Sequence, residues 1–423
     1  KQAKNVIAVA NLTSTSGLAS SSSRGPAEDG RIKPDVGAKG SYVYSTEENQ
    51  TYGTKSGTSM ACPGVSGVLA QLYQAYKELN SGQNPSSALM KAILLNTADD
   101  IGNPGPDFKY GWGEVNIYRA IKLLENGNYI TNSLDQGNTN THNIVVPSGT
   151  QEIKVMVYWH DKEASTSAST ALVNNLNIQL TSPTGIIYDP WVLDHTPNAS
   201  ILNQNAVRGI DNLNNMEQVT IDIPSAGNYT LSINGSSVPY GPQTYYVVYE
   251  FISDNIELTY PIGGESIVPG GNELIRWDTY NTSGSCIIDY SLDGGNNWIN
   301  ITNSANASNR YYNWYVPNTV TDNALVRITR NGVTDQSDAP FTIIDIPQNV
   351  TVDWICPDSI YVYWNAVNGA TSYEVNMLGL MYMDSMTTTS NLSTLIINPN
   401  PAITDSWFSV AAKLNNGKGR RAY

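Results

Sequence analysis

Residues 57–67 read GTSMACPGVSG and lead directly into a helical pattern. From Val65 onward the apolar residues recur every three or four positions, which predicts a helix with one buried face. We expect Pro63 to be tolerated in the first turn, where its missing N–H costs nothing. Ser59 is then expected at the entry to this helix. Free backbone N–H groups and the positive end of the helix dipole favour negative charge there.

A serine in this position has two interpretations. The commoner one is structural, in which Ser59 is only the N-cap of the helix. In the other, Ser59 is a nucleophile, because peptide hydrolysis requires a nucleophile, a base and donors for the developing oxyanion. The backbone N–H of Ser59 is itself a candidate oxyanion donor.

Four flanking segments favour the nucleophile. They are residues 22–26 (SSRGP), 33–36 (KPDV), 94–98 (LLNTA) and 110–116 (YGWGEVN). With GTSMACPGVSG they resemble, in family order, the subtilisin-like serine proteases (subtilases) over nearly all of residues 5–122. The resemblance implies an α/β fold with a parallel sheet, with Ser59 as catalytic nucleophile and Gly57 and Thr58 supporting the turn and the oxyanion site. The chain departs from the family pattern at Gly64, usually His, and at Lys39, usually Pro.

The catalytic base is expected outside this chain. The family places its Asp and His upstream of the serine, and no HGTH-like segment or aspartate motif of the family occurs among the 423 residues. The resemblance implies that both, and the side-chain Asn of the oxyanion hole, lie before Lys1, so the chain alone is expected to be inactive. Of the histidines His142, His160 and His195, only His160 has an adjacent aspartate, Asp161, and adjacent residues of a strand or turn point in different directions.

Composition excludes several other classes of protein. The formal charge of -14, without a Lys/Arg cluster, argues against nucleic acid as a partner. No run approaches the ~20 apolar residues that span a bilayer. Abundant Asn, Ser, Thr and Tyr indicate a secreted or cell-surface, mostly β protein. We expect the three cysteines, Cys62, Cys286 and Cys356, to be free and buried in separate domains.

The chain is predicted to hold four domains. Residues 1–125 read as the C-terminal part of a subtilisin-like catalytic domain, with strand 5–10, a helix that begins at Asn84-Pro85 and a short helix near 119–124. After Asn126 the pattern changes to short alternating strands such as 152–159 (EIKVMVYW). The later domains are expected at 126–253 (jelly roll), 254–345 (Ig-like sandwich) and 346–423 (truncated fibronectin type III-like).

The second domain raises the question of calcium. Residues 157–161 (VYWHD), 172–176 (LVNNL) and 214–217 (NNME) resemble the jelly-roll domain often fused behind subtilases, where a segment reading LVNDLDL contributes acidic residues to calcium sites. Here Asn175 and Asn177 stand in place of those acids. Asp161, Asp211 and Glu217 are the remaining candidate ligands. The alternative is that these are solvated turn carboxylates.

Residues 291–298 (SLDGGNNW) fit a single Asp-box hairpin, which we interpret as structural. The whole pattern predicts a secreted serine endopeptidase fragment that acts on protein or peptide substrates and requires the missing N-terminal part of its catalytic domain. The alternative is a non-catalytic cargo that secretion or cell-surface machinery recognises through its β modules.

Overall fold

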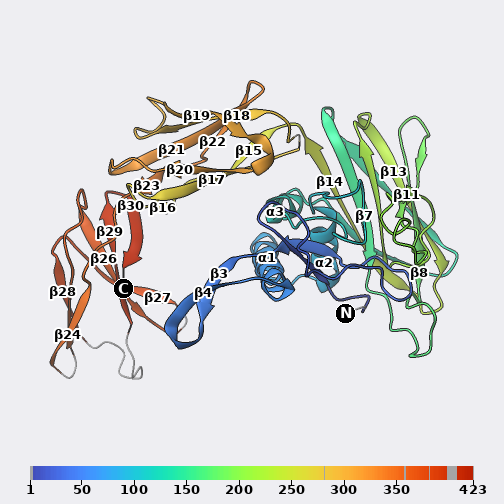
Figure 1. Cartoon of the computed structure of the whole chain (residues 1–423), viewed down its shortest axis with the longest axis horizontal. Coiled ribbons are helices and arrows are strands. Elements are labelled where there is room, and N and C mark those ends of the chain that lie inside the picture. The colour runs from blue at the N-terminus through green and yellow to red at the C-terminus, as the bar shows by residue number, and fades with distance from the viewer. Residues whose placement is uncertain (1–2, 281, 357–358, 381, 398–406, 423) are drawn as a thin grey trace. The chain divides into compact units, whose positions relative to one another are not determined.

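The computed structural model describes residues 3–280, 282–356, 359–380, 382–397 and 407–422 and is mostly β, with several separate sheets (Figure 1). The chain divides into two compact units, residues 1–253 and 254–423. The four-domain division remains a prediction.

The first unit opens with a small parallel sheet and three helices. Strands β1 (Val9–Leu12) and β2 (Val36–Lys39) pair in parallel, and a hairpin follows, made of β3 (Val43–Glu47), the 3-10 turn η1 (Glu48–Gln50) and β4 (Thr51–Lys55). The predicted strand at 5–10 was placed too early. Lys4 and Asn5 do not extend β1, because their side chains bind the segment at Asp161 and Lys162 instead.

The three helices are α1 (Thr58–Leu79), α2 (Ser87–Asn96) and α3 (Ile117–Glu125). The helix near 119–124 is confirmed, and Asn116 caps it by accepting the N–H of Arg119. The predicted start of α2 at Asn84-Pro85 was wrong, because Ser86 is the cap and accepts the N–H of Ala88. Pro63 lies in the second turn of α1, since that helix begins earlier than expected.

A sandwich of two four-stranded sheets completes the first unit. One sheet has the order β12-β7-β14-β5 and the other β6-β13-β8-β9, and a short pair β10-β11 lies outside them. The bounds are β5 Tyr129–Leu134, β6 Thr139–Val146, β7 Thr150–Trp159, β8 Asn175–Thr181, β9 Ile187–Tyr188, β10 Trp191–Val192, β11 Val207–Arg208, β12 Met216–Asp222, β13 Gly227–Ser237 and β14 Gln243–Ser253.

Strand β7 differs from the half-exposed pattern expected of residues 152–159. All residues from Ile153 to Trp159 are buried, because the sheet is covered on both faces. Val155 and Val157 point into the sandwich core, whereas Met156 and Tyr158 belong to a core shared with α2. A strand buried on both faces reads as a nearly continuous apolar run, as EIKVMVYW does.

The second unit begins with a sandwich of a three-stranded sheet, β15-β17-β20, and a larger sheet, β16-β23-β21-β18-β19, with β22 paired to β21. The bounds are β15 Ile256–Tyr260, β16 Ser266–Ile267, β17 Asn272–Thr279, β18 Ser285–Ser291, β19 Ile299–Asn306, η2 Ala307–Asn309, β20 Tyr311–Tyr315, β21 Thr321–Arg330, β22 Val333–Gln336 and β23 Phe341–Ile343. The Asp-box forms the expected turn, in which Asp293 accepts the N–H of Asn297 (2.9 Å).

The last strands form sheets β24-β25-β28 and β27-β26-β29-β30. Their bounds are β24 Thr351–Cys356, β25 Ser359–Tyr363, β26 Ser372–Leu378, β27 Met383–Thr389, β28 Ser393–Ile397, β29 Phe408–Leu414 and β30 Gly417–Ala422. Within the part of the chain that the structure describes, no helix is both long enough and apolar enough to cross a membrane.

Candidate active site

The segment before Ser59 is held against the carboxyl ends of the two parallel strands. Gly40, which follows β2, donates its N–H to Leu12 O at the end of β1 (3.1 Å) and accepts the N–H of Gly57 (2.8 Å). A Cβ on Gly40 would lie 2.6 Å from Gly57 O and 2.7 Å from Ala61 N. A residue without a side chain is therefore required where this backbone meets the start of α1. In α/β sheets, sites form at this end of the strands.

Ser59 is not the cap of its helix. Gly57 occupies the N-cap position, no side chain caps α1, and Ser59 is the second helical residue. Met60 and Ala61 donate their N–H groups to Gly57 O (3.0 and 3.2 Å), while the N–H groups of Thr58 and Ser59 open the helix, where a helix offers no internal acceptor. The Ser59 side chain is exposed. The hydroxyl is therefore accessible beside backbone N–H donors, which the capping interpretation does not explain.

Helix α1 is covered on one side only. Ala61, Val65 and Leu72 are buried, whereas Gly64 and Gly67 are exposed, and a Cβ on either glycine would meet nothing within 4 Å. Cys62 lies on this open face and is exposed. The prediction that it is buried was therefore wrong, because no described segment covers that side of α1. Cys286 is buried as expected, and the side chain of Cys356 lies outside the described residues.

The segments that flank the serine in sequence also meet in space. Trp112 donates its N–H to Asp35 O (2.9 Å), and Gly111 has φ +65° with its Cα against the same backbone, so that an added Cβ would lie 2.3 Å from Asp35 O. The backbones of residues 33–36 (KPDV) and 110–116 (YGWGEVN) thus pack directly against each other at the start of β2. Lys39, where the family usually has Pro, lies 3.8 Å from Glu114 as an ion pair.

Asp35 links β1, β2 and α2 from a fully buried position. Its carboxylate accepts from Ala8 N (2.7 Å) and Lys33 Nζ (2.5 Å) and lies 3.1 Å from Lys91 Nζ. Burial lowers the pKa of Lys91 to about 8, although the charge of Asp35 acts in the opposite direction. This cluster joins three elements of the first unit, and none of the hydrogen bonds and ion pairs named for it involves Ser59.

Within the described residues, no histidine hydrogen-bonds to Ser59. His142 Nε2 lies 2.8 Å from the hydroxyl of Tyr245. The ring of His195 packs against Gly30, where a Cβ would meet it at 2.5 Å. These two side chains are engaged elsewhere in the first unit.

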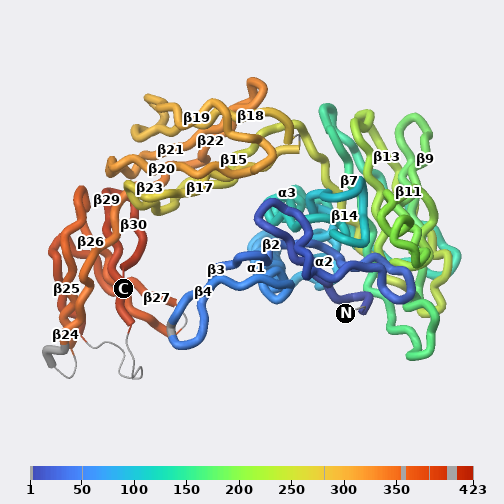
Figure 2. Tube along the Cα trace, in the orientation of Figure 1, coloured from blue at the N-terminus to red at the C-terminus, as the bar shows by residue number. Residues whose placement is uncertain are grey.

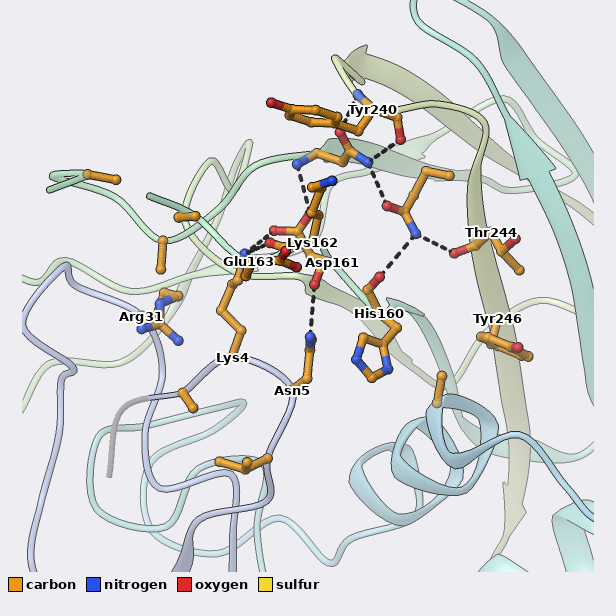
Figure 3. Close-up of a pocket in the computed structure, with 18 of the residues that line it drawn as sticks. Lys4, Asn5, Arg31, His160, Asp161, Lys162, Glu163, Tyr240, Thr244 and Tyr246 are labelled. Carbon is orange, nitrogen blue, oxygen red and sulfur yellow. Dashed lines mark hydrogen bonds and ion pairs between the residues drawn. The ribbon is translucent and has the colours of Figure 1, made fainter. Parts of the chain in front are cut away.

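The pair His160-Asp161 does not act as a base and its orienting partner. Asp161 is buried and binds Lys4 Nζ (2.5 Å), and it also accepts the N–H groups of Val173 and Asn174 (2.8 Å each). His160 lines a cavity of about 850 Å³ next to this ion pair, together with Lys4 and Tyr240 (Figure 3). Ser59 does not line that cavity.

The predicted calcium ligands do not form one cage. Asp161 is occupied as described, and Asp211 accepts the N–H groups of Leu213 and Asn214 and the Asn214 side-chain amide. Glu217 Oε2 accepts the N–H of Ile178, while its buried Oε1 has no hydrogen-bond partner. Burial raises the pKa of Glu217 well above its usual value, with the charge of Asp211 acting in the same direction.

The amide oxygens of Asn175 and Asn177 are, like Glu217 Oε1, buried without a hydrogen-bond partner. Calcium takes amide as well as carboxylate oxygens but binds more strongly where several are charged. Across the described ranges, no group of three His, Cys, Asp or Glu side chains could hold a metal ion. Asp161, Asp211 and Glu217 therefore do not form a calcium site by themselves, and calcium binding remains a prediction.

Comparison with known proteins finds a family match over the segment that contains Ser59. Residues 1–113 match the model of the Subtilase family, Peptidase_S8. The serine protease/ABC transporter B family protein tagA of Dictyostelium discoideum is 27% identical over 265 residues, which cover 53% of this chain and 15% of that protein. Thermitase of Thermoactinomyces vulgaris is 36% identical over 118 residues, covering 28% of this chain and 37% of the enzyme.

The extracellular serine protease of Serratia marcescens is 40% identical over 96 residues, covering 22% of this chain and 9% of that protein. The chain thus spans much less than two thirds of the length of these relatives. A solved structure of the prenylagaramide maturation protease PagA is 30% identical, with a TM-score of 0.24 and coverage of 28% of this chain and 42% of that one. The chain is thus similar to serine proteases.

Proposed function

We propose that residues 1–113, which match the subtilase family, carry the nucleophile of a secreted serine endopeptidase. One observation carries the proposal: Ser59 lies exposed in the first turn of α1, beside backbone N–H groups without a helical acceptor, and is not used as a cap. Those N–H groups and the helix dipole favour the negative charge that develops on the carbonyl oxygen during attack.

In this proposal Ser59 Oγ attacks the scissile carbonyl and its proton passes to a histidine outside the 423 residues. That histidine returns the proton to the leaving amine, and water then hydrolyses the acyl-enzyme on Ser59 by the reverse sequence of proton transfers. An aspartate, also outside the chain, holds the histidine. Asp35 is also a buried aspartate of this domain, but it binds Lys33 and Lys91 and has no part in these proton transfers.

The open side of α1 supports a partner segment at this site. The exposed face carries small residues, Cys62, Gly64 and Gly67, which would allow another backbone to approach closely. Strand β1 pairs only with β2 among the described strands, although on its other edge Asn11 already donates its N–H to Ser22 Oγ and accepts the N–H of Ala19. The exposed face of α1 therefore supports the proposal that residues outside this chain complete the catalytic domain.

The finer architecture belongs to the same proposal. Residues 1–125 would be the C-terminal part of the subtilisin-like α/β domain, followed by a jelly roll, an Ig-like sandwich and a fibronectin type III-like module. The β modules would stabilise the enzyme or hold it near substrate or a cell surface. The similarity to an extracellular protease supports secretion.

A fluorophosphonate probe tests the proposal. We expect it to label Ser59 in the longer protein that includes the preceding segment, and not in the 423-residue chain alone. Ser59→Ala should abolish labelling. Ser66→Ala, an exposed serine on the same helix, is the matched control and should leave labelling intact.

Two outcomes would contradict this account. Strong labelling of Ser59 in the chain alone would show that no outside base is needed. No labelling in the longer protein would favour the non-catalytic alternative, a cargo recognised through its β modules.

A further inference from the structure

We propose that the β3–β4 hairpin binds an extended stretch of polypeptide substrate that continues past the bond attacked by Ser59. This inference rests on the proposed function and adds a binding surface beyond the reacting groups. It also names the substrate class: an unfolded or locally extended polypeptide with aromatic or large apolar side chains.

The hairpin is rooted next to the nucleophile. Its base is closed by a hydrogen bond from Tyr42 N to Ser56 Oγ (2.8 Å), and by the bond from Gly57 N to Gly40 O. Ser56 is three residues before Ser59, so their Cα atoms are within about 10 Å of each other. A substrate held at Ser59 therefore passes close to the base of the hairpin.

The backbone of the hairpin has free edges. β3 and β4 form a two-stranded sheet by themselves, paired from Val43–Lys55 to Glu47–Thr51, and no other described strand joins them. Figure 2 shows the hairpin projecting from the end of β2, beyond the helices of the first unit. An open strand edge can add an extended peptide through main-chain hydrogen bonds. Each strand is five residues long, or about 17 Å, so the edge matches roughly five substrate residues.

One face of the hairpin is aromatic. Tyr44 and Tyr52 lie on the same face, because Tyr44 is opposite Thr54 and Tyr52 is opposite Thr46. Their rings are stacked, with centroids 5.6 Å apart and an interplanar angle of 20°. They remain 68% and 59% exposed, and Tyr42 at the base is 85% exposed.

The charged groups lie on the opposite face, where Lys55 and Glu47 form an ion pair at 3.3 Å. The two faces thus differ in character. Because the two rings are already ordered, they lose little further conformational entropy when they bind a ligand. They also provide a flat amphipathic surface against which a substrate side chain can pack. An isolated two-stranded hairpin is marginally stable in water, so a bound strand would also stabilise it.

The test uses the longer protein, with the segment that supplies the base, and two peptide substrates with the same scissile bond. The short substrate has two residues on each side of that bond, and the long one has eight on each side, including Leu and Phe. We expect Tyr44→Ser with Tyr52→Ser to lower kcat/KM for the long substrate about tenfold and to leave the short substrate unchanged. Tyr44→Phe with Tyr52→Phe keeps the rings and should restore the long-substrate value.

Tyr315→Ser, an exposed tyrosine of the second unit, is the control for loss of a surface ring and should change neither value. An equal loss on both substrates, or no loss on either, would overturn the inference. A long substrate with N-methylated amides on alternate residues should lose the same advantage without any change to the protein, which covers the case in which the serine variant does not fold. If the unmodified enzyme cleaves neither substrate, the proposed function fails and not the hairpin inference alone.

Discussion

Helices α1 and α2 follow each other in the chain, yet only one of them is fully enclosed. Nine of the ten residues of α2 are buried, against three of the 22 in α1. The sheet containing β7 and β14 packs on α2, whereas α1 packs mainly against β1, β2 and α3 and less extensively against α2. A helix that is apolar all round is expected in an interior, and the run ALMKAILL in α2 fits that rule. The comparison shows that the chain completes the surroundings of α2 and leaves one side of α1 open.

The largest effect is expected from a cavity under α2. Leu94 is 0% exposed, so Leu94→Ala should lower the free energy of unfolding of the first unit by about 2–5 kcal/mol. The matched change on α1, Leu79→Ala at a side chain 51% exposed, should cost less than about 0.5 kcal/mol. Urea unfolding followed by circular dichroism measures both. Equal losses would mean that the two helices are equally enclosed in solution.

A smaller loss is expected where the backbone meets the start of α1. Gly40→Ala places a Cβ 2.6 Å from Gly57 O, and relief of this overlap should cost about 1–3 kcal/mol. The change should also displace Ser59, so labelling of the longer protein by fluorophosphonate should slow. Unchanged stability and labelling together would show that this approach is looser than described.

The enclosed side of α2 also carries a pH dependence. Glu250 on β14 is buried, and burial raises its pKa from 4.5 to about 7, with Lys154 and Arg119 opposing the shift. The folded state therefore holds this proton more tightly, and stability should fall as pH rises from about 4.5 to 7, by at most about 1.4 kcal/mol per pH unit. Thermal melts from pH 4.5 to 8 should show this slope, and Glu250→Gln should flatten it. A slope that persists in the variant would assign the effect to other groups, such as Asp100, whose pKa burial raises to about 6.

The smallest effect is expected to differ between the 423-residue chain and the longer protein of the proposed function. Gly67 lies on the open face of α1 with free space around it, so Gly67→Ala should stabilise the 423-residue chain by about 0.5–1 kcal/mol through helix propensity. In the longer protein, where a segment is proposed to cover this face, the same methyl group should destabilise. Differential scanning calorimetry of both forms gives the sign. Stabilisation in both would argue against a covering segment at this point.

The sequence predicted much of the secondary structure around α1 and α2, whereas the remaining differences between the two helices depend on tertiary contacts. Apolar spacing predicted α1, a short helix was expected near residues 119–124, and GTSMA placed Ser59 at a helix entry. Ser86 and Asn84 are both good capping residues, so composition could not decide which one starts α2.

The burial of individual side chains could not be predicted without knowing which elements pack against them. Strand β7 was expected to have one open face, because the sequence does not state that α2 packs on it. Cys62 was expected inside because helical cysteines usually pack, and no sequence signal indicated that its side of α1 is open. The attachment of Lys4 to Asp161, 157 residues apart, has no local signature at all.

The core that α2 shares with β7 and β14 has a consequence for protein engineering. Because Met156 and Tyr158 share a core with Ile93 and Leu94, modules could not be exchanged freely at the boundary predicted near residue 125. A chimera that joined residues 1–125 to a β sandwich from a relative would inherit a mismatched interior, unless the apolar positions of α2 were transplanted with it. Recombination between related genes would be constrained in the same way, so the helix and the sheet should be inherited together.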